Sequence, residues 1–475
     1  MILQRFDVPG LAHYSYAVGC EKTGQMAIVD PERNIERYLD FARRNGARVT
    51  HVLETHIHAD YASGARELSE KTGAPVFAST YDVGETFTVA FPHTDVRDGD
   101  VFDLGSVRLK ALHTPGHTPE HLAFLVYDLA SHPDVPAVML SGDFLFVGSL
   151  GRPDLLGEDQ KLALARGMFR TVRDKLKGLP DSLEILPAHG AGSMCGSGMS
   201  GEASSTLGAE RLSNPYLDPT LDEDTFVKRL LGTVPVFPPY YRRMKRFNSE
   251  GHARPASVLS PPALPVADFA SRLEAGAVVI DTRDQVTFGA GHVPGAIGIG
   301  AGSGLAVWAS WLVPYEKPLL LVTRDAREAA DAAAGLARVG LDGVIGHLQG
   351  GFEAWTKSGK PVAMLPQVSP RDLHRRLTGG EPITVVDVRA PGEWNAGHVE
   401  GAVHLFGGTI TDHLGELPDK AAPVAVMCGG GYRSTAVASV LARHGFTNLL
   451  NVTGGMGAWM QQGLPTTGAA LACAG

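Results

Sequence analysis

The chain has 475 residues, 44% of them hydrophobic and 20% charged, with 42 Lys and Arg against 51 Asp and Glu for a net charge of −9. This length suits about two to four domains of ordinary globular composition, and the acidic balance excludes a general binder of nucleic acid or of an anionic membrane. The four cysteines lie far apart, which argues against a disulfide framework or a zinc knuckle. Arg5 and Asp7 interrupt any signal-peptide core, so we expect a cytoplasmic protein.

The first half of the chain alternates short apolar runs with polar turns. Strands are predicted at 26–30, 51–55, 74–79, 107–113, 137–143 and 183–189, and helices at 34–45, 62–72 and 159–176. Residues 242–257 are basic and then rich in Gly, Pro and Ser, so we read them as the end of this domain and a linker. The first domain is therefore predicted to span 1–250.

Histidine and aspartate residues recur where these predicted strands give way to loops. They lie in ETHIHADY (54–61), TPGHT (114–118), SGD (141–143) and PAHG (187–190). Side chains on such loops can converge at one edge of a sheet, and imidazole with carboxylate is suitable ligand chemistry for zinc or iron. The four segments together predict a metal site.

The order of these segments resembles the metallo-β-lactamase fold, an αββα sandwich. The family's HxHxDH motif is present as His56, His58 and Asp60, but Tyr61 stands where a second-metal histidine is expected, which favours a single metal. Within this fold the persulfide dioxygenases use one ferrous ion, and the resemblance implies one Fe(II) per chain (zinc as the alternative), held by the following residues: His56, His117 and Asp143. It further implies that four neighbours orient the ligands or move protons: His58, Asp60, Tyr61 and His189.

Two arginines and one cysteine are further candidates by resemblance to the same enzymes. Arg152 in GSLGRPD (148–154) is expected to bind the carboxylate of a thiol substrate or to brace the metal loop, and Arg211 in AERLSNPYL (209–217) to bind substrate. Cys195 lies in a glycine-rich loop where related multidomain enzymes carry a cysteine near the iron. It is either a persulfide acceptor or an inert loop thiol, whereas Cys20 is expected to be structural.

An internal repeat of about 105 residues fills the second half. Residues 278–299 match 384–405, and 350–362 match 454–466. In each copy short apolar runs alternate with helical patterns, which predicts parallel α/β sheets. We place the first copy at 255–362 and the second copy at 365–475.

The second copy contains the segment VMCGGGYRSTAVASVLARHG (426–445). A strand is predicted to end at Cys428, and a helix to begin at Ser434 or Thr435. Glycine N–H groups, the helix N-terminus and Arg433 would together favour the thiolate form of Cys428. The segment resembles rhodanese sulfurtransferases, which implies Cys428 as nucleophile, Arg433 as a catalytic partner, and substrate binding by the loop residues Gly429, Gly430, Gly431 and Tyr432.

The first copy also resembles rhodanese, but Thr323 occupies the position of Cys428, so we expect a degenerate module. Its 293–315 stretch has no formal charge. Five glycines and two prolines argue against a membrane span, and we expect this surface to be buried against another domain or a second subunit, in a homo-oligomer. The basic cluster 242–246 is either a solvated face or a site for a phosphorylated thiol carrier.

The whole chain thus resembles a persulfide dioxygenase fused to rhodanese modules. The expected partners are low-molecular-weight thiol persulfides, O₂ and sulfite, with no nucleic acid and no membrane, and the expected process is sulfide detoxification. The alternatives are a thioester hydrolase like glyoxalase II with accessory rhodanese modules, and a sulfur-relay scaffold without catalysis in the first domain. Tyr61 counts against the hydrolase, and the intact ligand set counts against the scaffold.

Overall fold

The computed structural model describes residues 1–8, 10–252 and 260–468. The chain forms two compact units, the first comprising 1–254 with 338–340 and the second comprising the rest. Among the described residues no helix combines the length and apolar character needed to cross a membrane.

The first unit is built on two six-stranded mixed sheets. The first sheet runs in the order β1 (Ile2–Val8), β2 (His13–Cys20), β3 (Gln25–Val29), β4 (Arg48–Leu53), β5 (Val76–Ser79) and β6 (Thr94–Val96). The second runs in the order β14 (Ser205–Thr206), β13 (Glu184–Pro187), β10 (Val138–Gly142), β9 (Leu122–Asp128), β8 (Val107–His113) and β7 (Val101–Asp103). A small hairpin of β11 (Leu145–Phe146) and β12 (Ser149–Leu150) follows β10.

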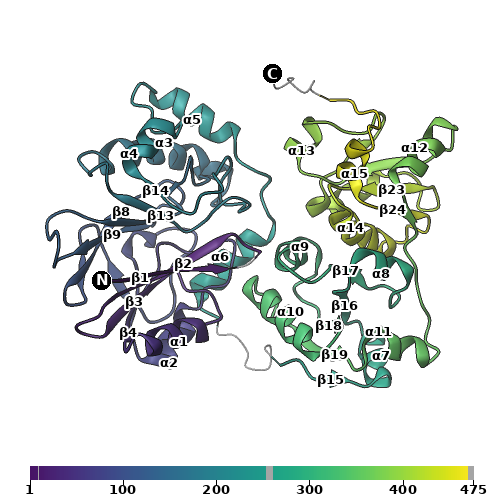
Figure 1. Cartoon of the computed structure of the whole chain (residues 1–475), viewed down its shortest axis with the longest axis horizontal. Coiled ribbons are helices and arrows are strands. Elements are labelled where there is room, and N and C mark those ends of the chain that lie inside the picture. Colours follow the sequence, from purple (N-terminus) through teal and green to yellow (C-terminus); the bar gives the residue numbers. More distant parts are fainter. Residues whose placement is uncertain (9, 253–259, 469–475) are drawn as a thin grey trace. The chain divides into compact units, whose positions relative to one another are not determined.

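Helices cover both outer faces of this sandwich (Figure 1). They are α1 (Glu36–Arg44), α2 (Ala65–Thr72), α3 (Glu158–Lys175), α4 (Leu207–Ser213) and α5 (Glu223–Gly232). The last helix, α6 (Tyr240–Glu250), instead packs on the loop 58–63, and η1 (Thr80–Asp82) is a 3₁₀ turn. One apolar cluster lies between the sheets, a second under α1 and α2, and a third under α3, α4 and α5. Alternating side chains of each strand therefore enter different layers, and the αββα sandwich is confirmed.

Residues 242–250 belong to the last helix of the first unit, in keeping with the reading of this stretch as the end of a domain. Residues 240–250 form α6, an amphipathic helix that buries Tyr241, Met244 and Lys245. Its arginines at 242, 243 and 246 are exposed, so the basic cluster is split between two faces. Residues 253–259 lie outside the described part of the chain.

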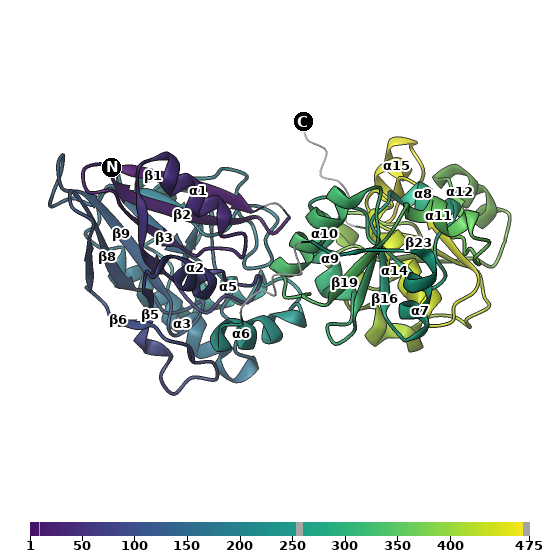
Figure 2. The ribbon, with the colours of Figure 1, turned by 90° about the horizontal axis from the view of Figure 1, so that it is seen from below.

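The second unit contains both repeat copies, each with its own parallel five-stranded sheet (Figures 1 and 2). The first sheet has the order β15 (Ala263–Leu264), β19 (Val344–Leu348), β18 (Leu319–Val322), β16 (Val278–Asp281) and β17 (Ile297–Gly298). Its helices are α7 (Val266–Glu274), α8 (Gln285–Ala290), α9 (Gly304–Leu312), α10 (Ala326–Arg338) and α11 (Gly351–Lys357).

The second copy repeats this topology with the order β20 (Gln367–Val368), β24 (Leu449–Val452), β23 (Val424–Met427), β21 (Thr384–Asp387) and β22 (Val403–His404). Its helices are α12 (Pro370–Thr378), α13 (Pro391–Asn395), η3 (Gly407–Glu416), α14 (Tyr432–Arg443) and α15 (Gly455–Gln461). Helix α14 begins two residues before the predicted start at Ser434, because Gly431 in the left-handed conformation caps it. The predicted parallel α/β architecture is confirmed.

The uncharged stretch 293–315 of the first copy is buried against the second copy. It contains β17 and α9, and the ring of Trp311 packs edge-on to Phe406 at 5.2 Å between centroids. A Cβ atom at Gly408 would lie 2.5 Å from the Trp311 ring, so the two surfaces fit closely. The sequence predicts burial against another domain or a second subunit, and the structure shows contact with another domain.

Candidate metal centre and sulfur-transfer loop

Three buried side chains of the first unit converge at one edge of the sandwich. His56 follows β4, His117 lies in the loop between β8 and β9, and Asp143 follows β10. Oδ2 of Asp143 lies 3.2 Å from Nε2 of His117 and 3.9 Å from Nε2 of His56. These are the residues that the sequence assigns as metal ligands, and the fold brings them together.

The hydrogen bonds around the two imidazoles leave one lone pair of each ring free. Thr55 Oγ1 donates to Asp30 Oδ2 at 2.9 Å and therefore accepts from Nδ1 of His56 at 2.9 Å. Nδ1 of His117 donates to the carbonyl oxygen of Arg152 at 2.9 Å. Burial lowers the pKa of both imidazoles well below the ordinary value, so both rings are neutral, as metal ligands must be.

Nε2 of His56, Nε2 of His117 and Oδ2 of Asp143 are buried and have no hydrogen-bond partner. Leaving three buried polar atoms unsatisfied is costly in free energy. Two imidazoles and one carboxylate form the facial set that suits ferrous iron and leaves other coordination positions open, and zinc accepts the same donors. The donor set fits a single divalent ion.

His189 ties this cluster to Asp60. Its Nδ1 lies 2.7 Å from Oδ1 of Asp143 and its Nε2 lies 2.7 Å from Oδ2 of Asp60. Burial alone would lower the pKa of His189, but the two carboxylates raise it to about 10. The charged ring thus fixes the orientation of Asp143, as expected for a residue that positions a ligand.

His58 and Tyr61 form their hydrogen bonds with residues outside the three ligands, although the rings of His58 and His56 lie 4.3 Å apart. Nε2 of His58 lies 3.2 Å from Oδ1 of Asp30 and 2.9 Å from Oε2 of Glu54. The Tyr61 hydroxyl donates to the carbonyl oxygen of Asp30 at 3.1 Å, and burial raises the pKa of this phenol well above its ordinary value. Its ring packs at 3.9 Å on His13, so the phenol is committed to a structural contact.

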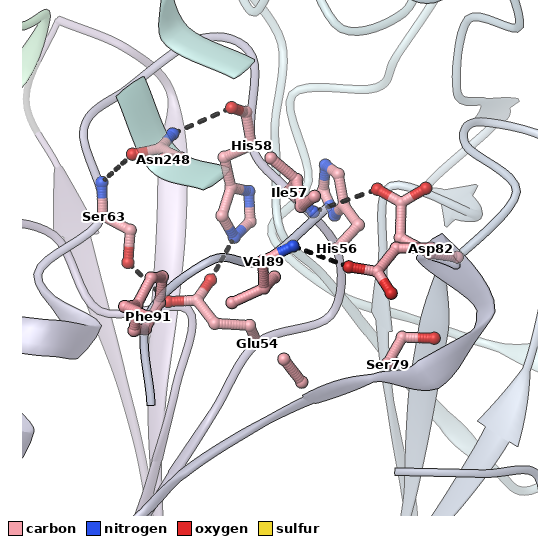
Figure 3. A pocket seen from close by; sticks show the side chains of 12 residues that line it. Glu54, His56, Ile57, His58, Ser63, Ser79, Asp82, Val89, Phe91 and Asn248 are labelled. Carbon is pink, nitrogen blue, oxygen red and sulfur yellow. Dashed lines mark hydrogen bonds and ion pairs between the residues drawn. The ribbon is translucent and has the colours of Figure 1, made fainter. Parts of the chain in front are cut away.

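A small cavity opens beside His56 and His58 (Figure 3). Its volume of about 30 Å³ is sufficient for about two water molecules. Glu54, Asp82 and Glu120 are among its lining residues, and Figure 3 shows Glu54 directed at His58. Burial raises the pKa of the Glu54 and Asp82 carboxyls. The cavity is a water-sized space next to His56 and His58, lined by apolar as well as acidic side chains.

The second centre is the loop that follows β23 in the second copy. The backbone N–H of Gly431 donates to Sγ of Cys428 at 3.1 Å, and the Ser434 hydroxyl donates at 3.4 Å. Gly431 has φ 96°, a left-handed conformation that turns its amide toward the sulfur. The thiol is thus held at the N-terminus of α14, which favours a negative charge.

Arg433 lies beside this sulfur and is also paired with a carboxylate. Its guanidinium forms two hydrogen bonds with the Glu393 carboxylate, at 2.6 and 2.7 Å. This ion pair keeps the pKa of Glu393 below its ordinary value, and Glu393 together with Cys428 raises the pKa of Arg433. The charge that the sequence predicts beside Cys428 is therefore present, and Glu393 shares it.

The hydroxyl of Tyr432 donates to the carbonyl oxygen of Gly300 in the first copy at 2.9 Å, so this group is engaged in a contact between the copies. Substrate binding by Tyr432 stays a prediction. Gly429 lies under the Arg433 guanidinium, and a Cβ atom at Gly430 would meet nothing within 4 Å. Substrate binding by the glycine amides stays a prediction.

Comparisons with known proteins agree with this architecture. The family model "Metallo-beta-lactamase superfamily" matches residues 8–189, and the "Rhodanese-like domain" model matches 265–358 and 369–462. A solved structure of a metallo-beta-lactamase from Staphylococcus aureus is 32% identical with a TM-score of 0.66, and the match covers 74% of this chain and 99% of that one. The chain belongs to the metallo-β-lactamase superfamily.

Curated relatives match the metallo-β-lactamase part. The uncharacterized protein ML0493 of Mycobacterium leprae is 32% identical over 242 residues, which is 46% of this chain and 99% of that protein. A hydroxyacylglutathione hydrolase of Polaromonas is 33% identical over 178 residues, or 37% of this chain and 62% of that enzyme. The chain is therefore a member of the metallo-β-lactamase superfamily with two rhodanese-like domains added.

Cys195 of the metallo-β-lactamase domain is not the flexible loop thiol that its flanking glycines predict. It is 1% exposed, its carbonyl oxygen accepts from the N–H of Arg152 at 2.9 Å, and its sulfur lies 3.6 Å from the Tyr241 hydroxyl. Burial raises the pKa of this thiol well above its ordinary value. Its ligand atom lies within 4.8 Å of those of Asp60 and His189, next to the metal cluster.

The two arginines expected to bind substrate have other partners. The Arg152 guanidinium is buried and binds both carboxylate oxygens of Asp154, so the structure supports its bracing role and contradicts binding of a substrate carboxylate. Arg211 donates to the carbonyl oxygens of Leu176 and Leu179, beyond the end of α3. These contacts hold Arg211 against the segment that follows α3, and substrate binding by Arg211 stays a prediction.

Sequence reasoning missed several residues around this centre. Asp30 accepts hydrogen bonds from both Thr55 and His58, and it adopts a positive φ of 53°, uncommon outside glycine. Lys245 of α6 is buried, and its Nζ lies 3.4 Å from Oε1 of Glu120. Asp30 could have been found from the sequence, because it ends the predicted strand 26–30 as the other site residues end theirs. No local pattern singles out Lys245 from its three exposed basic neighbours.

Proposed function

We propose that this protein is an iron-dependent persulfide dioxygenase coupled to a rhodanese sulfurtransferase that makes thiosulfate. The observation that carries the proposal is the presence, on one chain, of three unpartnered ligand atoms in a two-histidine, one-carboxylate set and of a thiol held by the Gly431 amide. The first centre would produce sulfite, and the second would consume it. Fusion raises the local concentration of this shared compound.

In the first reaction, a persulfide RSSH with O₂ and H₂O gives RSH, sulfite and two protons. His56, His117 and Asp143 would hold the ferrous ion, which supplies open positions for the terminal sulfur and for O₂. Thr55 and the carbonyl oxygen of Arg152 fix the imidazole rings, and the His189 cation fixes the carboxylate. These contacts preorganise the site before the substrate arrives.

In the second reaction, the Cys428 thiolate attacks the outer sulfur of a persulfide RSSH. A new sulfur–sulfur bond forms on Cys428, the bond within RSSH breaks, and RSH leaves with its proton. Sulfite then takes the outer sulfur from the Cys428 persulfide, which gives thiosulfate and regenerates the thiolate. The amide of Gly431 and the hydroxyl of Ser434 are placed to stabilise the anionic sulfur.

A thioester hydrolase is the second candidate, supported by one feature of the site. Asp60, His189 and Cys195 form another buried cluster of donors, and Oδ1 of Asp60 has no hydrogen-bond partner. A second metal there would suit hydrolysis, and one relative carries the name hydroxyacylglutathione hydrolase. Against it, both nitrogens of His189 are already bound to carboxylates.

The test is to purify the full chain anaerobically, measure its metal content, and supply either glutathione persulfide with O₂ or S-lactoylglutathione. We expect about one iron per chain, O₂ uptake with the persulfide, and no hydrolysis of the thioester. The variant His117→Ala should abolish O₂ uptake, whereas Cys428→Ser should retain it. Two zinc ions per chain with thioester hydrolysis, or no O₂ uptake by iron-loaded protein, would overturn the assignment.

A further inference from the structure

The first rhodanese copy has no nucleophile, yet it contacts the helix that carries the sulfur-transfer loop. Thr323 stands where the second copy has Cys428, and its hydroxyl donates to the carbonyl oxygen of Asp325. Helix α14 of the second copy packs against β17 and α9 of the first copy. The first copy, which lacks a nucleophile, thus packs against α14, the helix whose N-terminus holds Cys428 in the second copy.

Tyr432, the first residue of α14, makes the contact nearest to the reactive sulfur. Its hydroxyl donates to the carbonyl oxygen of Gly300 at 2.9 Å, and burial raises the pKa of the phenol. A Cβ atom at Gly304 would lie 2.9 Å from the Tyr432 ring, and one at Gly300 would lie 3.2 Å away. The Tyr432 ring therefore occupies the space beside both glycines. At position 304 a residue larger than glycine does not fit unless the ring moves.

One peptide unit separates this anchored side chain from the amide that holds the sulfur. The N–H of Gly431 donates to Sγ of Cys428, and the carbonyl of Gly431 accepts from the hydroxyl of Thr435 at 2.8 Å. The direction of that N–H depends on the left-handed backbone of Gly431, which leads directly into Tyr432. A shift of the Tyr432 ring must therefore be absorbed by a glycine with wide conformational freedom.

Two further contacts hold the remainder of α14 to the first copy. The Ser439 hydroxyl accepts from the N–H of Gly298 at 3.0 Å, and the Arg443 guanidinium donates to the carbonyl oxygen of Gly295. Together with Tyr432 they fix the start, middle and end of the helix. The N-terminal dipole that favours an anionic sulfur is thus aimed by the first copy as well as by the sheet of the second.

We infer that the first copy is a positioning platform for the sulfur-transfer loop, and that Tyr432 and the Gly300–Gly304 segment form the latch between them. This inference rests on the proposed sulfurtransferase role of Cys428 and adds a role for the module that lacks a nucleophile. Tyr432 is a positioning residue, because it acts on the sulfur through Gly431.

The decisive variant lies in the first copy. Gly304→Ala puts a methyl group against the Tyr432 ring but touches no residue of the Cys428 loop other than Tyr432. Gly415→Ala in η3 is the matched control, since a Cβ atom there meets nothing within 4 Å. Tyr432→Phe removes only the hydrogen bond to Gly300, and Tyr432→Ala removes the whole latch.

Two measurements on the full chain report on the latch. The first is sulfur transfer from thiosulfate to cyanide, which needs no metal. The second is the pH dependence of iodoacetamide alkylation at Cys428, read by mass spectrometry of the peptide that contains it. We expect Gly304→Ala and Tyr432→Phe each to lower kcat about 2- to 10-fold, the equivalent of one hydrogen bond, with a smaller change in KM. The alkylation midpoint should shift to higher pH, because a misdirected Gly431 amide stabilises the thiolate less.

In the Tyr432→Ala background, Gly304→Ala should have no further effect on either measurement, since the two residues act through one contact. The inference is overturned if Gly304→Ala and Tyr432→Phe both match Gly415→Ala in kcat and in the alkylation profile, or if they lower only the melting temperature. If the wild-type chain transfers no sulfur, the proposed sulfurtransferase function fails. The alkylation profiles still decide the latch, so the two failures are distinguishable.

Discussion

Removal of the metal should lower the free energy of unfolding of the first unit. The three ligand atoms set an upper limit to this change. Nε2 of His56, Nε2 of His117 and Oδ2 of Asp143 are buried without partners, and each such atom costs about 1–3 kcal/mol. An ion that satisfies all three therefore has about 3–9 kcal/mol to recover. Ferrous iron at 100 times its Kd stabilises the fold by about 2.7 kcal/mol. For a unit of this size that is a rise of about 5–11 °C in Tm.

Anaerobic differential scanning calorimetry of the full chain with iron, and after chelation, measures this change. We expect one transition to move with iron, and the transition of the second unit to stay where it is. His117→Ala should abolish the iron-dependent shift. His113→Gln, a half-buried histidine outside the cluster that binds the carbonyl oxygen of Pro119, should retain it. An unchanged Tm with iron, or an undiminished shift in His117→Ala, would refute the assignment of the ligands.

Three further predictions concern charge and sulfur chemistry. Cys428→Ser should abolish thiosulfate formation from glutathione persulfide and O₂ while sulfite accumulates, as measured by ion chromatography; continued thiosulfate formation would contradict the nucleophile assignment. Because Arg433 lowers the pKa of the half-buried Glu393, their pair should add up to about 1 kcal/mol of stability above the ordinary carboxyl pKa, lost as the pH falls through the lowered value. The difference between Glu393→Gln and wild type in urea unfolding should thus be present at pH 7 and disappear as the pH falls below the lowered pKa of Glu393, and a constant difference would exclude this cause. Lys245→Met should cost about 3 kcal/mol by stranding the buried Glu120 carboxylate, and adding Glu120→Gln should recover most of it in the same unfolding assay.

The fold was predictable because its signals are local. Strand β8 begins and ends at the residues that its apolar run indicates, and α3 covers all but the last position of its predicted helix. The residue pattern of each ligand segment places a histidine or aspartate directly after a strand. His56 follows a strand of the first sheet, whereas His117 and Asp143 follow strands of the second, so their positions in the chain predict loop-borne ligands and the packing of the two sheets brings the three together.

Burial, in contrast, was not predictable from the glycines around Cys195 or from the charge of Arg152. The loop that contains Cys195 is packed, because Arg152 donates to the carbonyl oxygen of Met194 and its N–H to that of Cys195. Both arginine candidates carry the right charge for a substrate carboxylate. Their guanidinium groups are nevertheless used by the protein itself, and only the contacts decide between these uses.

The sequence by itself determined the two kinds of domain and the duplication, and it predicted the ligand set and the reactive cysteine, since each is encoded in short segments or in their repetition. Only the tertiary structure decided which distant side chains meet. His58 reaches Asp30 across 28 residues, Lys245 reaches Glu120 across 125, and Tyr432 reaches Gly300 across 132. Such pairings depend on how layers and domains pack, because the shapes of two surfaces must match, and no local pattern records that match.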